Sequence, residues 1–356
     1  MSESSEYGRE KGGKNTIRRP LRSEFKKKFA RTGMDSHVGY KAGREVQLTP
    51  IEHAIAGAAS GVVTRTFVQP LDVLKIRFQL QVEPTWRRGG GLYHGVLQST
   101  LKIIQNEGLF GLWKGHVPAQ LLSISYGIGQ FWSYEIFTRA VSEYTDGKRK
   151  LTAVCGGLAG VCGTLVSLPC DVIRTRLVAQ GTPKIYNGVI NAFSKIVKQE
   201  SVFSLWKGLL PTLAMSAPQT ALVFYFYTSF LNISKYLFVN SEENNIAPWL
   251  SYSAVSGTAA GVCAKVCIYP LDVLKKRFQI IGFEEARRQF GKVVIYPSAW
   301  SCIVSITREE GLRAWFKGLW PSMLKGGASS GIIFVTYEAT CTAFARRHLN
   351  QENDVS

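Results

Sequence analysis

A short charged signature occurs three times in this chain of 356 residues, each time directly after an apolar stretch. Every copy has a proline, an aspartate two residues later, and a lysine or arginine five and seven residues after the proline; the copies begin at Pro70, Pro169 and Pro270. On a helix, positions three apart lie on one face, so the aspartate and the first base of each copy share a side. Acids and bases arranged in this way form ion pairs, and they do not provide the nucleophile with an adjacent base that an enzyme requires.

Three further cations do not follow the threefold pattern. Arg65 and Lys265 stand five residues before the signature proline in the first and third copies, where the second copy has Thr164. Lys325 lies eight residues after a lysine that recurs in every copy, and the other two copies have apolar residues there. A charge within an apolar span costs roughly 2.5–3.5 kcal/mol, so a function is the default interpretation. We expect none of these cations to have an acidic partner in its own repeat, and such a set suits a phosphate or pyrophosphate. The alternative is a structural role in contact with backbone carbonyls.

Polar and aromatic residues on adjacent turns complete the candidate binding site, namely Tyr126, Gln130 and Gln219. Tyr126 would stack on a heteroaromatic ring, and its alternative role is to pack between helices. The sequence has no Walker loop and no glycine-rich nucleotide turn, which argues against an enzyme that hydrolyses phosphate. These residues therefore favour binding of an anion over its chemical conversion.

Long helices must position these side chains, and six stretches have the necessary length. A membrane-spanning helix needs about 20 largely apolar residues. The mean hydropathy is only +0.01, but helices that line an aqueous path keep a polar face, so six amphipathic spans are compatible with this value. The predicted spans are 51–80, 116–140, 150–179, 209–236, 248–279 and 319–345.

Other features repeat in register with the signature. Two glycines precede each signature proline by 13 and 9 residues, a spacing that lets helix backbones approach closely in lipid; the pairs are Gly57 and Gly61, Gly156 and Gly160, and Gly257 and Gly261. A glutamate and a Trp/Phe-Lys-Gly motif precede the second span of each third of the chain. Between the two spans, residues 95–106, 186–199 and 296–309 are predicted to form helices that lie on the membrane surface.

The composition limits the classes of partner. The net charge of +18 indicates an anionic partner, but no motif typical of nucleic-acid binding is present, so nucleic acid is not expected.

Most of the seven cysteines lie in apolar stretches without a Cys-x-x-Cys pair. We expect reduced thiols rather than disulfides or a metal site, and no cofactor. Residues 1–47 are rich in lysine and arginine and are predicted to be a disordered tail.

The threefold signature Pro-x-Asp-x-x-Lys/Arg-x-Lys/Arg, with its period of about 100 residues, resembles that of the mitochondrial carrier family. The resemblance extends from about residue 48 to about residue 345. It implies an all-α membrane protein with six transmembrane helices in three pseudo-symmetric repeats and short surface helices on the matrix side. The repeats would be 48–146, 147–245 and 246–346, with a C-terminal tail at 347–356. It also implies a monomeric solute carrier, not an enzyme, that crosses the mitochondrial inner membrane several times.

The resemblance assigns roles to the signature residues. In the family the acid of one repeat pairs with the base of another and closes the matrix side, which implies the pairs Asp72–Arg174, Asp171–Lys275 and Asp272–Lys75. The alternative is three unrelated interfacial ion pairs. Gln79 and Gln279, nine residues after the proline, match the family's bracing glutamine, and the second repeat has Val178 there. Two braces are therefore expected.

The opposite gate departs from the family pattern, in which an acid is followed three residues later by a base. Glu135 is followed by Thr138, and Glu338 is followed by Cys341. The second repeat has Tyr227 followed by Thr228 instead of an acid. A weak or absent ion-pair network is expected on the cytosolic side, where apolar and tyrosine contacts would have to close the protein.

Four stretches resemble a branch of the family whose substrate is thiamine pyrophosphate. The resemblance implies import of this substrate in exchange for a nucleotide by alternating access, with cardiolipin as a lipid partner. A nucleotide or coenzyme A carrier is the alternative within the family, because the same three cations would serve either substrate. From other classes, a membrane-embedded enzyme lacks catalytic groups, and a non-transporting scaffold would be expected to lose the signature charges. The stretches are 76–81, 113–124, 174–176 with 179–181, and 269–272 with 282–284 and 286–287.

Overall fold

The computed structural model describes residues 48–83, 91–142, 149–181, 184–237, 246–283, 294, 296 and 298–355. Within these ranges every regular element is helical, as the sequence predicts. The predicted tail at 1–47 lies outside the described residues, and so do residues 284, 286 and 287 of one stretch discussed above.

Six long helices form the body of the described protein. The first begins with a capping box, in which Thr49 and Glu52 bond to each other's backbone, and Pro50 occupies the first turn, where no amide donor is needed. The helices are α2 (Pro50–Leu80), α4 (His116–Ser142), α5 (Arg149–Ala179), α7 (Leu209–Leu237), α8 (Ile246–Gln279) and α10 (Leu319–Val355).

The helix bounds agree with the predicted spans to within two residues, except at the end of α10. That helix continues to Val355, whereas a tail is expected from residue 347. Its extension contacts the start of α2, because His348 Nε2 lies 2.7 Å from Glu52 Oε1. A contact between the last and the first long helix thus supports the additional turns.

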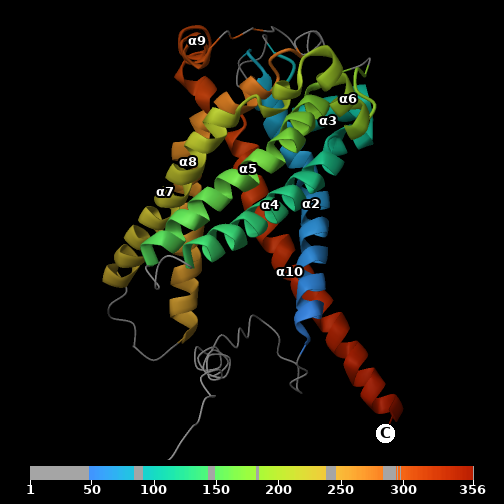
Figure 1. Ribbon diagram of the computed structural model, residues 1–356, viewed down its shortest axis with the longest axis vertical. Coiled ribbons are helices and arrows are strands. Elements are labelled where there is room, and N and C mark those ends of the chain that lie inside the picture. The colour runs from blue at the N-terminus through green and yellow to red at the C-terminus, as the bar shows by residue number, and fades with distance from the viewer. Residues whose placement is uncertain are drawn as a thin grey trace, which may run out of the picture.

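Successive repeats are joined by packing of the second helix of one repeat along the first helix of the next. In this way α4 packs on α5, α7 on α8, and α10 on α2, so the bundle closes on itself (Figure 1). Each first helix contains its signature proline. A proline inside a helix removes one backbone hydrogen bond and favours a bend, which would direct the three first helices towards one another.

Short helices lie together at one end of the bundle, opposite the projecting C-terminal end of α10 (Figure 1). They are α3 (Val96–Glu107), α6 (Val189–Gln199) and α9 (Ala299–Ser305), the last continued by a π-helical turn at Ile306–Glu310. The three predicted surface stretches are therefore helical. We call this the surface-helix end. The largest cluster of buried apolar side chains joins α3 and α6 to α2 and α5, and includes Val73, Ile103, Ile173 and Ile196.

Among the described residues, three segments are long and apolar enough to cross a membrane by composition alone, at Val154–Ala179, Val202–Ser234 and Val255–Gln279. The other three long helices, α2, α4 and α10, have the length but do not reach the same apolarity. Composition therefore identifies fewer spans than the threefold repeat predicts.

The prediction of close packing at the glycine pairs is wrong for this structure. A Cβ added at five of the six paired glycines would meet no atom within 4 Å, apart from the helix itself, and at Gly257 it would meet only the Tyr227 ring, at 3.9 Å. The close approach occurs elsewhere, where a Cβ on Gly129 of α4 would lie 3.2 Å from the Cα atom of Gly163 in α5. The glycine pairs lie towards the opposite end, away from the level at which the signature residues of the first helices meet.

All seven cysteines are free thiols, as expected. Among the described residues no group of histidine, cysteine, aspartate and glutamate is arranged to hold a metal ion.

Candidate functional site: a ring of ion pairs

The three signature aspartates each contact a base of another repeat. Together these contacts form a closed ring around α2, α5 and α8, which we call the ion-pair ring. Its members are Asp72 Oδ2 and Arg174 Nη2 at 2.5 Å, Asp171 Oδ2 and Lys275 Nζ at 2.8 Å, and Asp272 Oδ2 and Lys75 Nζ at 2.7 Å. All three aspartates are buried. The pairing that the family resemblance implies is thus present in the geometry.

Each aspartate of the ring also holds a second cation. Lys325 Nζ lies 2.7 Å from Asp72, and Lys265 Nζ lies 3.1 Å from Asp272. The expectation that Lys265 has no acid in its own repeat is therefore wrong. Its flexible four-carbon stem reaches along α8 to an aspartate seven residues later. The second cation at Asp171 is Lys276, at 2.8 Å, which the sequence reasoning did not single out.

Arg65 makes different contacts from the two lysines. It donates a hydrogen bond of 2.9 Å to the carbonyl of Ala119 and another to the hydroxyl of Ser123, and it thereby connects α2 to α4. The bond to the Ala119 carbonyl is the kind of contact expected if Arg65 had only a structural role. A guanidinium has five donors, however, so these two bonds leave capacity for an anion. Arg65 stands two helical turns before Asp72 in α2.

The uncharged candidates lie on α4 and α7. Tyr126 is exposed and stands one turn after Ser123, while Gln130 and Gln219 are half-buried. Within the described part of the chain, their side chains make no hydrogen bond to another residue. Their role in ligand binding stays a prediction.

One glutamine braces the ring, not two. Gln279 donates to Asp171 Oδ2 at 2.7 Å, and its side-chain oxygen accepts from Thr175 at 2.6 Å and from Lys276 at 2.9 Å. Gln79 is buried near the Tyr269 hydroxyl, but neither polar atom of its amide makes a hydrogen bond of good geometry to a described residue. At its junction Lys75 and Lys265 both contact the same oxygen of Asp272, and no bond from Gln79 reaches this carboxylate.

A second set of ion pairs lies between the ring and the surface helices. Arg77 is buried, contacts Glu107 at 2.6 Å, and donates from Nε to the carbonyl of Val178 in the next repeat at 3.3 Å. Lys114 adds a second cation to Glu107 at 2.5 Å. The equivalent clusters are Arg176, Glu200 and Lys207, and Arg277, Glu310 and Lys317. The repeated glutamate and Trp/Phe-Lys-Gly motif was the available signal, but spacing alone did not indicate that the second base of the signature would bind this glutamate.

In two of these clusters the bases lower the pKa of the glutamate. Burial raises the pKa of Glu107, but hydrogen bonds and charge from Arg77 outweigh this effect, so the pKa lies below its ordinary value. The pKa of Glu200 is lowered in the same way by Arg176 and Lys207, against the effect of burial.

The glycine of the Trp/Phe-Lys-Gly motif lies directly against the ring. Gly208 has φ of +89°, and a Cβ there would lie 3.2 Å from the carbonyl oxygen of Lys275. Gly318 has φ of +82°, and its Cβ would lie 2.9 Å from the carbonyl oxygen of Lys75. Only glycine combines this backbone conformation with so close an approach.

Comparison with known sequences agrees with this threefold architecture. The profile of the family described as Mitochondrial carrier protein matches residues 46–145, 150–236 and 248–348. The chain belongs to the mitochondrial carrier family.

Several curated members of the carrier family are similar to this chain over most of its length. The human protein named Mitochondrial thiamine pyrophosphate carrier is 42% identical over 300 residues, which cover 83% of this chain and 93% of the relative. Mitochondrial thiamine diphosphate carrier 2 of Zea mays is 38% identical, covering 80% and 91%. Mitochondrial thiamine pyrophosphate carrier 1 of Phaeosphaeria nodorum is 34% identical, covering 80% and 90%.

At the opposite end of this carrier, the described contacts are sparse and local. Glu135 pairs with Arg139 of its own helix at 2.8 Å, and both side chains are exposed. His53 Nδ1 lies 2.9 Å from the Tyr337 hydroxyl, joining α2 to α10. No ion pair connects Glu135 or Glu338 to another repeat within the described residues. The weak network expected from the sequence stays a prediction.

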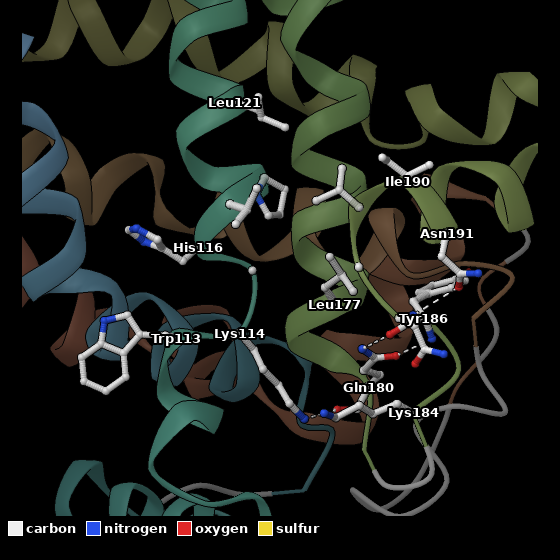
Figure 2. Close-up of a pocket in the computed structure, with 16 residues that line it drawn as sticks. Trp113, Lys114, His116, Leu121, Leu177, Gln180, Lys184, Tyr186, Ile190 and Asn191 are labelled. Atoms are coloured by element: carbon white, nitrogen blue, oxygen red, sulfur yellow. Dashed lines mark hydrogen bonds between the residues drawn. The ribbon is translucent and has the colours of Figure 1, made fainter.

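A cavity of about 840 Å³ lies on the surface-helix side, between the start of α4 and the start of α6 (Figure 2). Lys114 and Lys184 line it together with apolar side chains such as Leu121 and Ile190. The loop before α6 is held by two hydrogen bonds between the Gln180 side chain and the backbone of Tyr186, at 2.9 and 3.1 Å.

Proposed function

We propose that this carrier imports thiamine pyrophosphate across the mitochondrial inner membrane by alternating access, in exchange for a nucleotide. The main support for this substrate is the similarity to relatives named Mitochondrial thiamine pyrophosphate carrier, which are 42% identical over 83% of the chain. All six long helices would span the membrane in three repeats. The protein would act as a monomeric transporter and not as an enzyme, and none of the contacts around the ring brings a nucleophile to a general base.

The three symmetry-breaking cations support an anionic substrate with more than one charged group. Lys325 and Lys265 contact the ring aspartates Asp72 and Asp272. Arg65 stands two helical turns before Asp72 in α2. All three cations therefore belong to or adjoin the ring, where a diphosphate would contact more than one of them.

Binding of the diphosphate would act on the ring, which serves as the matrix gate in this proposal. Lys325 and Lys265 bond to Asp72 and Asp272, so a diphosphate would compete with these aspartates for the same ammonium groups. Both aspartates are buried, so each needs its remaining base once the second lysine has moved to the substrate, and the junction is held less strongly than before. Tyr126 would stack on the aminopyrimidine ring, and Gln130 and Gln219 would donate or accept hydrogen bonds beside it.

A nucleotide or coenzyme A carrier remains the second candidate. Both substrates have phosphate groups and a heteroaromatic ring, so Arg65, Lys265, Lys325 and Tyr126 would serve them as well. Sequence similarity to thiamine pyrophosphate carriers over 83% of the chain favours the first candidate.

An anionic phospholipid such as cardiolipin is proposed as the lipid partner. The cavity in Figure 2 offers Lys114 and Lys184 beside an apolar lining. Two ammonium groups and apolar side chains suit phosphate groups and acyl chains.

The proposed function is tested by reconstitution into liposomes loaded with unlabelled nucleotide. We expect uptake of labelled thiamine pyrophosphate that saturates with concentration, and uptake of thiamine near that of empty liposomes. Coenzyme A and free nucleotides, added outside as competitors, should inhibit less than unlabelled thiamine pyrophosphate. Stronger inhibition by coenzyme A or a nucleotide would assign the carrier to the second candidate.

A further inference from the structure

The second cations of the ion-pair ring do not come from equivalent positions. Lys325 reaches its aspartate from α10 and Lys265 from two turns earlier in α8, and their side chains are 33% and 26% exposed. Lys276 lies four residues after Asp272 in α8, one turn closer to the surface-helix end, and its side chain is only 7% exposed. A substrate that enters from the opposite end would therefore meet two of these lysines and not the third.

Lys276 is held by three partners at the junction of repeats 2 and 3. Its ammonium lies 2.8 Å from Asp171 Oδ1, 3.0 Å from the Thr175 hydroxyl and 2.9 Å from Gln279 Oε1. An ammonium group has three donor hydrogens, so this geometry uses all of them. The first and second repeats have Ile76 and Thr175 at the equivalent position. Lys276 is thus a feature of one junction alone.

The other two junctions have fewer contacts of their own. At Asp72, the second cation comes from Lys325 of α10, and Val178 stands where a bracing glutamine would be. At Asp272, the second cation is Lys265, and the Gln79 amide makes no hydrogen bond of good geometry to the described residues. At Asp171, by contrast, both bases and the glutamine belong to the ring itself.

We propose that the three junctions of the gate differ in how they respond to substrate, and that Lys276 causes this difference. Substrate weakens the junctions at Asp72 and Asp272, because it binds their second lysines. Lys276 keeps the junction at Asp171 closed whether or not substrate is bound. This inference rests on the proposed role of the ring as the matrix gate. The junction of repeats 2 and 3 is then the last to open. Lys276 acts as a positioning residue for the gate, because it does not touch the substrate.

The first experiment compares Asp72→Asn, Asp272→Asn and Asp171→Asn by binding of thiamine pyrophosphate to purified carrier. Each variant weakens one junction and releases one primary base. The three variants differ in which second cation loses its aspartate: Lys325, Lys265 or Lys276. We expect Asp72→Asn and Asp272→Asn to bind about threefold to tenfold more tightly than the wild type, because Lys325 or Lys265 no longer has a competing carboxylate. Asp171→Asn should bind as the wild type does. Equal affinity changes in all three variants would overturn the proposal.

The second experiment needs no substrate. Lys276→Thr introduces the residue of repeat 2, Lys276→Arg keeps the charge, and Lys198→Thr on the exposed face of α6 is the control with the same change in net charge. We expect Lys276→Thr to lower the thermal midpoint of the substrate-free protein by about 2 °C or more, with Lys276→Arg closer to the wild type than to Lys276→Thr. If Lys276→Thr does not fold, Lys276→Met, which keeps the volume without the charge, takes its place.

The same variants are then compared by leak of internal substrate from liposomes without external substrate. Lys276→Thr should leak on the order of tenfold faster or more, the change that loss of one charge-assisted bond produces in an equilibrium. The substrate concentration at half-maximal exchange should stay within about twofold of the wild type. If Lys276→Thr matches Lys198→Thr in thermal midpoint and leak, Lys276 has no role in the gate. A failure of thiamine pyrophosphate to bind would contradict the proposed function, and the thermal comparison would still test Lys276.

Discussion

At the scale of single residues, lysine side chains connect the candidate binding site to the ion-pair ring. Lys325 and Lys265 each contact an aspartate that is also paired with a primary base. A buried carboxylate with two bases is more strongly held than one with a single base, and a cation shared in this way is available to a competing anion. Substrate binding and gate stability would therefore depend on the same two ammonium groups.

We expect Lys325→Ala, Lys265→Ala and Arg65→Ala each to weaken binding of thiamine pyrophosphate by about 10-fold to 100-fold, since each removes a charge-assisted contact of roughly 1.5–3 kcal/mol. The loss should be smaller for thiamine monophosphate, which has fewer charges to pair, and thiamine itself should bind poorly to every variant. Titration of the three ligands into each purified variant measures this. Unchanged binding of thiamine pyrophosphate by Lys325→Ala and Arg65→Ala would mean that these cations are structural.

The two glutamines provide a matched comparison, because the chain itself places valine at the equivalent position of repeat 2. Gln279→Val should lower the thermal midpoint of the substrate-free protein, since it removes bonds to Asp171, Thr175 and Lys276. Gln79→Val should have a smaller effect or raise the midpoint, because it removes a buried amide without hydrogen bonds. A larger loss for Gln79→Val would show that Gln79 is the engaged brace.

At the scale of elements, buried arginines fix the surface helices to the bundle. Arg77 bonds to Glu107 at the end of α3 and to a backbone carbonyl of the next repeat. Arg176 and Arg277 make the same two kinds of contact. One side chain therefore holds three elements together, which explains why the second base of the signature is buried while the first belongs to the ring.

These clusters predict a dependence of stability on pH. The pKa of Glu200 lies below its ordinary value of 4.5 because bonds from Arg176 and Lys207 outweigh burial. A carboxylate with a lowered pKa in the folded state stabilises the protein above its unfolded-state pKa, and this stability is lost as pH falls through the folded-state value. Glu200→Gln should therefore be less stable than the wild type at pH 7, and it should lose less stability on acidification below pH 4.5. Thermal midpoints measured across this range test it, and equal acid losses would contradict it.

At the scale of the whole molecule, the two ends of the bundle differ. The surface-helix end has the ion-pair ring and the arginine clusters beneath it, whereas the described contacts at the opposite end are a few isolated pairs such as Glu52–His348. In this conformation, ion pairs therefore hold the three repeats together at one end of the bundle. This difference suits a carrier whose matrix gate is held by ion pairs and whose cytosolic side closes through tyrosine and apolar contacts.

Charge reversal tests this difference between the ends. Asp272→Lys should abolish most exchange in liposomes, because two lysines would then face a positive charge. Combination with Lys75→Asp should restore only part of the activity, since Lys265 still faces that charge. The control is the double variant Glu135→Gln and Glu338→Gln at the opposite end, which should change the exchange rate much less. Normal exchange by Asp272→Lys alone would show that the ring is not a gate.

The six long helices, the surface helices and the repeat could be predicted from residue spacing, because charges, prolines and glycines recur at fixed helical intervals. The family resemblance also indicated the partners in the ion-pair ring. The folded structure was needed to show that Lys325 and Lys265 bond to ring aspartates, that Lys276 belongs to the ring, that one glutamine of two is engaged, and that most of the paired glycines have no close neighbour. These depend on distances between helices and on the reach of flexible side chains, and residue spacing along one helix contains neither.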